Sequence, residues 1–486
     1  MIFTILIPFV AGALVRIIPF KKRSNKELFL EAMVVLNSIL VWSLILNGGN
    51  EVFTVARYTG NLSIAFKMDG LSRIFAGLVS FLWPLATLYA FEYMTKEERE
   101  DTFFMFYTMT YGVTLGIAMS ANILTMYFFY ELLTLITVPL VMHTLTREAI
   151  LASRKYLYYS LGGAAFGFIG MIFIIIYGAT ISFQYGGVFG DVTWAVSSDI
   201  LLVVYVLAFM GFGVKAAICP FNSWLPAAGV APTPVTALLH AVAVVKSGAF
   251  AIIRLTFFCY GAERLRGTWA QKFLMCIVIF TIVYGCSRAV KETHIKRRLA
   301  YSTISNLSYI LFGVILLTPA GLLGALCHLV FHAFMKIASF FCAGSIMHQT
   351  DKHYVYELDG MGYRLPIVFS VFTVSSLALM GVPGLAGFIS KWYLCSAAAE
   401  SGDVLAYIGI GGLLISALLT AIYMLTIVVR AFFPVKDTNF AKISEYKDPN
   451  WKMIVPLMVF TVAVVVFGVY SEPFVALFNQ VAMGLV

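Results

Sequence analysis

The sequence predicts an all-α membrane protein that crosses the bilayer many times, and three observations lead to this fold class. Of the 486 residues, 61% are hydrophobic and only 12% are charged, whereas soluble globular proteins have about 25% charged residues. Apolar windows long enough to span a bilayer occur about fourteen times. Lysines and arginines fall in short breaks between these windows, so the net charge of +9 forms no single patch for nucleic acid.

The first apolar window is expected to remain in the protein as a membrane span. Lys21, Lys22 and Arg23 follow it, whereas a cleaved signal peptide carries its positive charge in front of the apolar stretch. Residues 51–67 alternate around a Gly-Asn turn and predict an external hairpin. The predicted spans are residues 2–19, 28–47, 69–93, 103–121, 123–143, 154–179, 200–219, 234–258, 271–290, 299–318, 320–347, 366–395, 404–433 and 452–471.

Positive charge separates the loops into two sets. Loops after odd-numbered spans are rich in lysine and arginine, and loops after even-numbered spans hold few. The positive-inside rule then puts the first set in the cytoplasm of a cell with the protein in its inner (plasma) membrane, and both termini outside. The rich set includes Lys96, Arg99, Arg147, Arg154, Lys155, Arg288, Lys291, Lys296, Arg297, Arg298, Lys352, Arg364, Arg430, Lys436, Lys442, Lys447 and Lys452.

The seventh and twelfth spans are predicted to be broken helices. Prolines follow Lys215 in the seventh span, and one proline and three glycines precede Lys391 in the twelfth. Interrupted segments in corresponding halves indicate an inverted-repeat transporter, so we expect two inverted five-helix repeats, spans 4–8 and 9–13. The expected domains are spans 1–3 with the hairpin (1–102), the first repeat (103–260), the second repeat (261–433) and the C-terminal span (434–486).

Four lysines lie well inside predicted spans, namely Lys215, Lys246, Lys336 and Lys391. A lysine at the centre of a spanning helix costs about 2.5–3.5 kcal/mol on insertion, so the four together cost about 10 kcal/mol. Ionisable residues at this depth commonly mark an ion or proton path. The sequence therefore predicts a proton relay through the membrane.

Glu131 lies inside the fifth predicted span. A carboxyl group buried alone keeps its proton, whereas a cation such as Lys215 within about 5 Å holds it ionised and makes the pair switchable. A static structural salt bridge is the alternative.

In the eighth span, His240 and Lys246 are six positions apart and point to different sides of a helix, which argues against a common metal site. Lys246 is a relay candidate; His240 is a further candidate, with a helix–helix hydrogen bond as its alternative role.

The eleventh span contains His328, His332 and Lys336 at a spacing of four. This spacing puts all three on one helix face, with a rise of about 6 Å per step, and bridging water can complete a relay between them. Two histidines four apart also fit a zinc site. No glutamate follows the first histidine, however, and no third ligand is evident, so the relay is the better interpretation.

The sequence predicts no cofactor and no metal in this chain. It has no GxxxxGK[ST] motif, no GxGxxG after a strand, and no haem or iron–sulfur cysteine spacing. Six of the seven cysteines lie in apolar runs without a CxxC pair. We expect free, buried thiols.

These residues resemble a known family, the antiporter-like membrane subunits of respiratory complex I, of Mrp-type cation/proton antiporters and of membrane-bound hydrogenases. The similarity extends across most of spans 5–12. The matching stretches are YELLTL at 130–135, residues 215–248, LAYSTISNLSYI at 299–310, HLVFHAFMKIASFFCAGSIMHQ at 328–349 and GVPGLAGFISKW at 381–392.

The resemblance implies fourteen helices, two inverted repeats and a hydrated row of charged residues at the membrane midplane. It also implies a shorter family member that lacks the long lateral helix of the largest paralogues. The implied correspondences are the Glu–Lys pair at Glu131 and Lys215, the central lysine at Lys246, the bridging residues at His328, His332 and Lys336, and the exit residue, a glutamate in some members, at Lys391.

Together, the residues and the resemblance predict an ion-translocating subunit of a larger membrane complex. Its expected partners are other membrane subunits, including paralogous ones, with lipid, protons and, as the alternative ion, Na⁺. We favour a redox-driven complex whose iron–sulfur or flavin centres lie in partner subunits. The alternatives are a member of an Mrp-type Na⁺/H⁺ antiporter complex without redox chemistry and a scaffold with an inactive channel. The sequence does not decide whether the complex is an enzyme.

Overall fold

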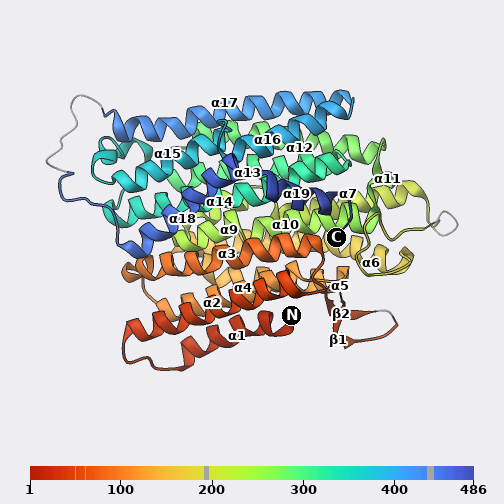
Figure 1. The fold of residues 1–486 in the computed structure, drawn as a ribbon, viewed down its shortest axis with the longest axis horizontal. Helices are drawn as coiled ribbons and strands as arrows, with labels where there is room; N and C mark the ends of the chain where they lie inside the picture. Colours follow the sequence, from red (N-terminus) through yellow and green to blue (C-terminus); the bar gives the residue numbers. More distant parts are fainter. Residues whose placement is uncertain (50, 61, 191–195, 435–442, 486) are drawn as a thin grey trace.

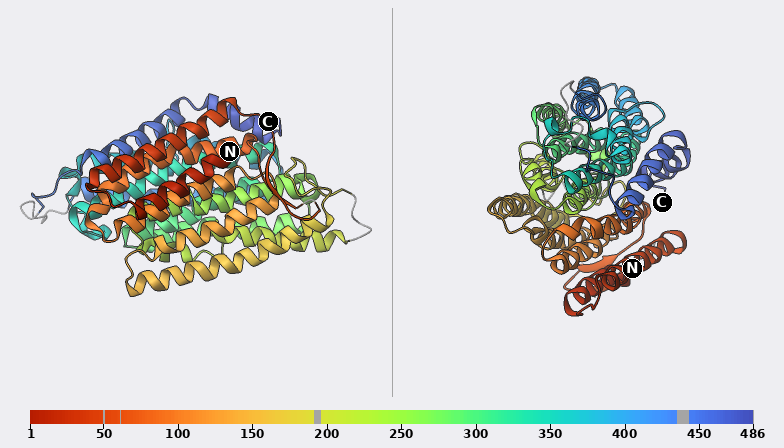
Figure 2. Two further views of the ribbon diagram at one scale, coloured as in Figure 1. Left: turned by 90° about the horizontal axis from the view of Figure 1, so that it is seen from below. Right: turned by 90° about the vertical axis from the view of Figure 1, so that its left-hand side faces the viewer.

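The computed structural model describes residues 1–49, 51–60, 62–190, 196–434 and 443–485. Figure 1 shows the long helices running along one common direction, with the β1–β2 hairpin at one end of the bundle. In the end-on view of Figure 2, α1 and α2 (red) lie at one edge. Asn61 of the predicted hairpin turn and the loop lysines Lys436 and Lys442 lie outside the described residues.

The chain forms helices and one two-stranded sheet, in which β1 and β2 pair antiparallel. The elements of the first half are α1 (Ile2–Ile17), α2 (Arg23–Asn47), β1 (Phe53–Arg57), β2 (Ser63–Phe66), α3 (Gly70–Tyr93), η1 (Met94–Lys96), α4 (Glu100–Ala118), α5 (Ile123–Val141), α6 (Arg147–Tyr177), α7 (Ser198–Lys215), α8 (Trp224–Ala227), η2 (Ala228–Val230), α9 (Thr233–Ala241), α10 (Val244–Ile253) and the π-helix η3 (Arg254–Tyr260). Those of the second half are α11 (Ala262–Leu265), α12 (Trp269–Lys291), α13 (Ile295–Ile315), α14 (Pro319–Thr350), η4 (Val355–Glu357), η5 (Met361–Tyr363), α15 (Pro366–Met380), α16 (Ala386–Glu400), α17 (Val404–Phe432), α18 (Trp451–Val469) and α19 (Glu472–Ala482).

The protein is a helical, polytopic membrane protein. Within the described residues, ten helical segments are long and apolar enough to cross a membrane. Two shorter apolar helices, α1 and α15, accompany them. The ten segments are Arg23–Asn47, Gly70–Lys96, Ile123–Val141, Arg147–Tyr177, Ser198–Lys215, Thr233–Tyr260, Trp269–Lys291, Pro319–Thr350, Val404–Phe432 and Trp451–Val469.

Two of these segments form the centre of the bundle. The most apolar windows of Thr233–Tyr260 and Pro319–Thr350 are entirely buried, whereas only 28% of the corresponding window of α2 is buried. A helix that is apolar on all sides and fully enclosed belongs to the core. The central segments are therefore the ones that carry His240, Lys246, His328, His332 and Lys336.

Helices end or break beside several of the buried lysines. Helix α7 ends at Lys215, and the α15–α16 break lies between Met380 and Ala386, shortly before Lys391. The eighth predicted span lies within the membrane-spanning segment Thr233–Tyr260. The prediction that it is one continuous helix, however, was wrong. It breaks between α9 and α10, at Val242 and Ala243, so the helical angle assumed between His240 and Lys246 does not apply.

Candidate functional site

His328, His332 and Lys336 lie on α14, which is buried on all sides. Thr318 caps the helix by accepting a hydrogen bond from the Gly321 backbone N–H (3.0 Å), and Pro319 occupies its first turn. From there α14 runs for 32 residues, and the side chains of His328, His332 and Lys336 are 0% exposed. A buried polar group needs a partner, so each contact of these side chains matters for the site.

Lys246 and His332 are joined directly. A hydrogen bond of 2.9 Å connects Lys246 Nζ and His332 Nδ1, although the residues are 86 positions apart. Both side chains are completely buried. Lys246 is the third residue of α10, so it follows immediately after the α9–α10 break. The break thus fixes the depth at which the lysine meets α14.

His328 continues the contact from α14 toward α16. Its ring stacks on the His332 ring, with centroids 5.4 Å apart and an interplanar angle of 17°. Its Nδ1 hydrogen-bonds to Ser390 Oγ at 2.9 Å, one position before Lys391. The Tyr309 ring of α13 lies 5.1 Å from the His328 ring and 5.5 Å from Lys391 Nζ. Ser390 and Tyr309 therefore connect the histidines with Lys391.

Lys391 is held by the end of the preceding helix. Its ammonium donates to the backbone carbonyls of Leu379 (2.7 Å) and Met380 (2.9 Å), the last residues of α15. Carbonyls at a helix C-terminus lack intrahelical donors and favour a cation. Gly381 ends α15 with φ of 93°, and an added Cβ there would lie 3.0 Å from Lys391 Cδ. The glycine thus allows both the turn and the passage of the lysine chain.

Lys336 lies one turn beyond His332 and has different partners. Its ammonium donates to the Leu299 carbonyl (3.2 Å) and to Ser302 Oγ, both on α13. His240, on α9, is 0% exposed, and neither ring nitrogen has a hydrogen-bond partner in the described part of the chain. His240 packs on the Phe340 ring at 4.8 Å and lies within the electrostatic reach of Lys336 and Lys296.

Glu131 and Lys215 are near one another but do not form an ion pair. They interact electrostatically, yet no nitrogen–oxygen distance between them is within 4.0 Å. The Lys215 ammonium instead donates to the Tyr130 backbone carbonyl and lies 3.5 Å from the centre of the Tyr130 ring. Glu131 Oε1 is buried without a partner among the described groups. The two side chains are therefore adjacent but not directly bonded, and we call Glu131 and Lys215 the open pair.

Several polar residues of this region could not be singled out from the sequence. Ser302, Tyr309 and Ser390 contact the lysines and histidines, but serine and tyrosine are too common to stand out in a sequence. Lys296 was counted as a loop charge, yet it is 7% exposed and donates to the Ala231 carbonyl at 2.8 Å. Ser302 and Tyr309 are polar residues on α13, which packs beside the histidines of α14. Their spacing along α13 was the signal that could have found these two residues.

The predictions from the sequence also missed the buried charge of Arg254. Its guanidinium is 0% exposed and forms two hydrogen bonds of 2.7 Å with the Asp69 carboxylate. A third bond, of 3.0 Å, reaches Ser72 Oγ. Asp69 also caps α3 by accepting from the Ser72 backbone N–H at 2.9 Å. Every charge in this pair has a close partner.

The buried row consists of groups that can exchange protons. Lysine and histidine both bind and release a proton at nitrogen, and α10, α14 and α16 bring Lys246, two histidines and Lys391 into one succession of contacts. Within the described ranges, no three His, Cys, Asp or Glu side chains are grouped to hold a metal ion. Fold and row together define a polytopic membrane protein with a row of proton-exchanging side chains in its core.

The chain belongs to the NADH:quinone oxidoreductase/Mrp antiporter transmembrane family, whose sequence model matches residues 120–420. Residues 56–104 match the N-terminus of chain 5 of NADH-ubiquinone oxidoreductase (complex I). The family match includes every residue of the predicted relay.

Relatives lie on both sides of this family. The chain is 27% identical over 432 residues to NADH-quinone oxidoreductase subunit N of Desulforudis audaxviator, which covers 86% of this chain and 85% of the relative. It is 29% identical over 453 residues to a Na⁺/H⁺ antiporter subunit of Alkalihalophilus pseudofirmus, covering 87% of this chain but 55% of that larger protein. One chain of the archaeal membrane-bound sulfane sulfur reductase has the same fold, with a TM-score of 0.85 at 21% identity over 100% of this chain and 97% of the other.

Proposed function

We propose that the chain is a proton-translocating membrane subunit of a redox-driven complex, in which Glu131, Lys215, Lys246, His328, His332, Lys336 and Lys391 carry protons. The observation that supports this most directly is the Lys246–His332 hydrogen bond of 2.9 Å, followed by the contacts through His328 and Ser390 toward Lys391. A buried lysine bonded to a buried histidine is costly as a purely structural device. As a proton carrier it has a use.

The proposed path starts at the open pair. When Glu131 moves away or is neutralised, the Lys215 ammonium loses its stabilising charge and passes its proton toward Lys246. Charge on Lys246 then favours transfer through His332 and His328 toward Lys391, where the two α15 carbonyls accept hydrogen bonds from the ammonium. Lys336, one helical turn from His332, carries protons as well, and His240 lies within its electrostatic reach. Each step needs an energy change of about 1.4 kcal/mol per pKa unit.

The proposed topology has fourteen spans, with spans 4–8 and 9–13 as inverted repeats and both termini outside the inner membrane. The α7 end at Lys215 and the α15–α16 break lie five predicted spans apart, as two repeats require. Single cysteines at Lys96 and Thr59, probed with an impermeant thiol reagent on a cysteine-free background, test the sidedness. Labelling of Lys96→Cys from the cytoplasm and of Thr59→Cys from outside is expected; the opposite result contradicts the topology.

The proposed partners are further membrane subunits, including paralogues of this chain, with any iron–sulfur or flavin centre in those partners. An Mrp-type Na⁺/H⁺ antiporter complex is the second candidate, favoured by the 29% identity to a protein of such an antiporter. Purification of the intact complex through a tag on this chain, followed by subunit identification and an optical and paramagnetic resonance spectrum, separates the two. Bound redox centres support the first proposal, and a complete complex without them supports the second.

A further inference from the structure

A group of buried polar atoms between α2, α3 and α4 has no partner in the fold. The atoms are Glu31 Oε2 on α2, Trp83 Nε1 on α3 and Tyr107 Oη on α4, none of which has a hydrogen-bond partner among the described residues. Both amide atoms of Asn37 on α2 also lack a hydrogen bond of ordinary geometry within this part of the chain, although Tyr111 lies close to them. Asn37, Trp83 and Tyr107 are 0% exposed. Burying a polar group without a hydrogen-bond partner is unfavourable, so several together need an explanation.

These atoms belong to one connected cluster. The Trp83 ring lies 5.7 Å from the Tyr107 ring and stacks on the Tyr111 ring at 5.0 Å. Tyr107 lies within the electrostatic reach of Glu31. At the other end of the cluster, Tyr111 Oη hydrogen-bonds to Ser38 Oγ at 2.8 Å and also interacts with the Asn37 side chain. The cluster therefore follows the buried side of α2 from Glu31 to Ser38.

The chemistry of the cluster fits water and a proton better than a metal ion. The indole of Trp83 and the amide nitrogen of Asn37 are donors, and a bare cation accepts only lone pairs, which these groups cannot offer. Water uses donors and acceptors together and typically makes about three hydrogen bonds when buried. Glu31 supplies the one carboxyl group among these unpartnered atoms, and therefore the group that can bind a proton.

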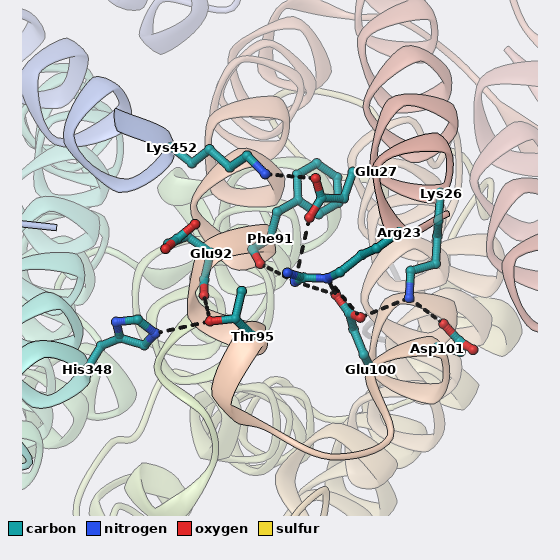
Figure 3. A network of polar contacts seen from close by, with 10 residues as sticks. All are labelled: Arg23, Lys26, Glu27, Phe91, Glu92, Thr95, Glu100, Asp101, His348 and Lys452. Carbon is teal, nitrogen blue, oxygen red and sulfur yellow. Dashed lines mark hydrogen bonds and ion pairs between the residues drawn. The ribbon is translucent and has the colours of Figure 1, made fainter. Parts of the chain in front are cut away.

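The start of α2, which precedes Glu31, carries a network of charged residues. Figure 3 shows the network at the start of α2, where Arg23 pairs with Glu100 (2.7 Å), Lys26 with Asp101 (2.6 Å), and Glu27 with Lys452 (2.7 Å). A cavity of about 480 Å³ opens there. Glu31 follows Glu27 by one helical turn.

The other end of the cluster is closed. Beyond Ser38, Val41 is 0% exposed, and Trp42 and Ile45 pack on Gly77 of α3. Tyr107 on α4 is the titratable group within electrostatic reach of Glu31. The charged groups at the start of α2, on the elements packed there, are Arg23, Lys26 and Glu27 on α2, Glu92 on α3, Glu100 and Asp101 on α4, Arg16 on α1, and Lys452 on α18.

We propose that α2, α3 and α4 enclose a hydrated proton-binding site centred on the Glu31 carboxyl, which fills from the charged end of α2 and is separate from the lysine–histidine row. The site takes a proton with its water and is independent of the proposed relay. In it, water donates to Glu31 Oε2 and Asn37 Oδ1 and accepts from Trp83 Nε1.

Water in the cluster can be detected by X-ray hydroxyl-radical footprinting of the intact chain in its native complex, because radicals formed from bound water oxidise the side chains beside it. Trp83 should be oxidised although it is fully buried. Trp224 is the matched control: it is also 0% exposed, but its Nε1 donates to the Val214 carbonyl at 2.8 Å. Equal protection of Trp83 and Trp224 would mean a dry cluster and would overturn the proposal.

Proton binding is tested with dicyclohexylcarbodiimide, an apolar reagent that modifies protonated carboxyl groups, on native membranes across a pH series. Peptide mass spectrometry should show labelling at Glu31 that falls as pH rises, and no label at this position in Glu31→Gln. Glu131→Gln should leave Glu31 labelling unchanged, so failure of the relay and failure of this site give different results. Absent or pH-independent labelling at Glu31 overturns the proposal.

Discussion

Two buried acid–base pairs in this protein have opposite designs. Asp69, the N-cap residue of α3, and Arg254, the first residue of η3, are joined by two bonds of 2.7 Å. Ser72 and the rings of Phe183, Phe250 and Phe258 surround the guanidinium. Glu131 and Lys215 interact without an ion pair, and the lysine is bound by a backbone carbonyl and a tyrosine ring. The first pair is closed and the second is open.

The difference teaches what a buried charge is used for. A guanidinium remains protonated under all physiological conditions, and a bidentate pair fixes geometry. A lysine with a carboxylate nearby but not bonded can lose its proton when that carboxylate changes, because little has to be broken first. We therefore propose a structural role for Asp69–Arg254 and a transport role for Glu131–Lys215, and the first two of the four changes below test that division.

The largest expected effect is on stability, from Asp69→Asn. It leaves the Arg254 guanidinium buried without a counter-charge, and breaking a buried pair costs about 3–5 kcal/mol. Thermal unfolding of the purified chain in detergent should show a clear loss of stability. Adding Arg254→Leu should restore part of it, because the unpaired charge is then gone.

Glu263→Gln is the matched control for that change. Glu263 pairs with Arg266 at 3.4 Å on the surface, with side chains 89% and 47% exposed, and exposed pairs contribute little. If Asp69→Asn is as mild as Glu263→Gln, the closed pair does not hold the fold as we infer.

The second change, Glu131→Gln, should affect transport and leave assembly intact. Glutamine keeps the shape of the side chain but removes the charge that acts on Lys215. Proton uptake by inverted membrane vesicles should fall by about tenfold or more, which corresponds to about 1.4 kcal/mol added to the activation free energy. Glu148→Gln, at the exposed start of α6, serves as the control. Near-normal uptake in Glu131→Gln would refute the role of the open pair.

The third change concerns Lys336, whose partners are Ser302 and the Leu299 carbonyl. Lys336→Ala should reduce uptake severalfold without destabilising the fold, since removing an expensive buried charge need not lower stability. Lys336→Arg should also fail, because a guanidinium does not release its proton. Lys272→Arg, at the exposed start of α12, is the control. Full activity in Lys336→Arg would mean that the residue provides charge or structure.

The sequence located the buried lysines and histidines because ionisable residues are conspicuous in apolar windows. Lys246 and His332 were both candidates, and the structure joins them with one hydrogen bond. Their partnership depends on how α10 packs against α14, and a pattern within one helix carries no such information. The α9–α10 break was missed for a similar reason: Val242 and Ala243 are ordinary helix residues, and tertiary packing decides their conformation.

The Asp69–Arg254 pair shows the same limit of prediction from sequence. Asp69 precedes Gly70-Leu71-Ser72 and is suited to a helix N-cap, a role that the structure gives it. Its second role, as the partner of Arg254, joins positions 185 residues apart. Arg254 follows Lys246 by eight residues in the same apolar run, which was the available signal that it too is buried. Nothing local indicates that one cation has a bonded carboxylate and the other has none.

The smallest expected effect is a local dependence on pH at the loop before α13, where a titratable group lies outside the spans and is only partly enclosed. Burial, with Lys296, His353 and Arg297 nearby, lowers the pKa of His294 from 6.5 to about 4. The folded loop therefore favours the neutral ring. Above about pH 6.5 this histidine has no effect on stability; as pH falls from 6.5 toward 4, the unfolded loop binds a proton that the folded loop rejects, and the loop loses stability.

Hydrogen exchange measures this loss at two amides that close the loop. The Ile295 N–H donates to the His353 carbonyl (3.0 Å), and the Val355 N–H donates to the Thr293 carbonyl (2.9 Å). Relative to the intrinsic rate at each pH, their exchange should accelerate between pH 6.5 and 4. His294→Gln should abolish the acceleration and His353→Gln should retain it. If both variants behave alike, the pH response comes from elsewhere in the loop. The partial burial of His294 would then not be the cause of the pH dependence.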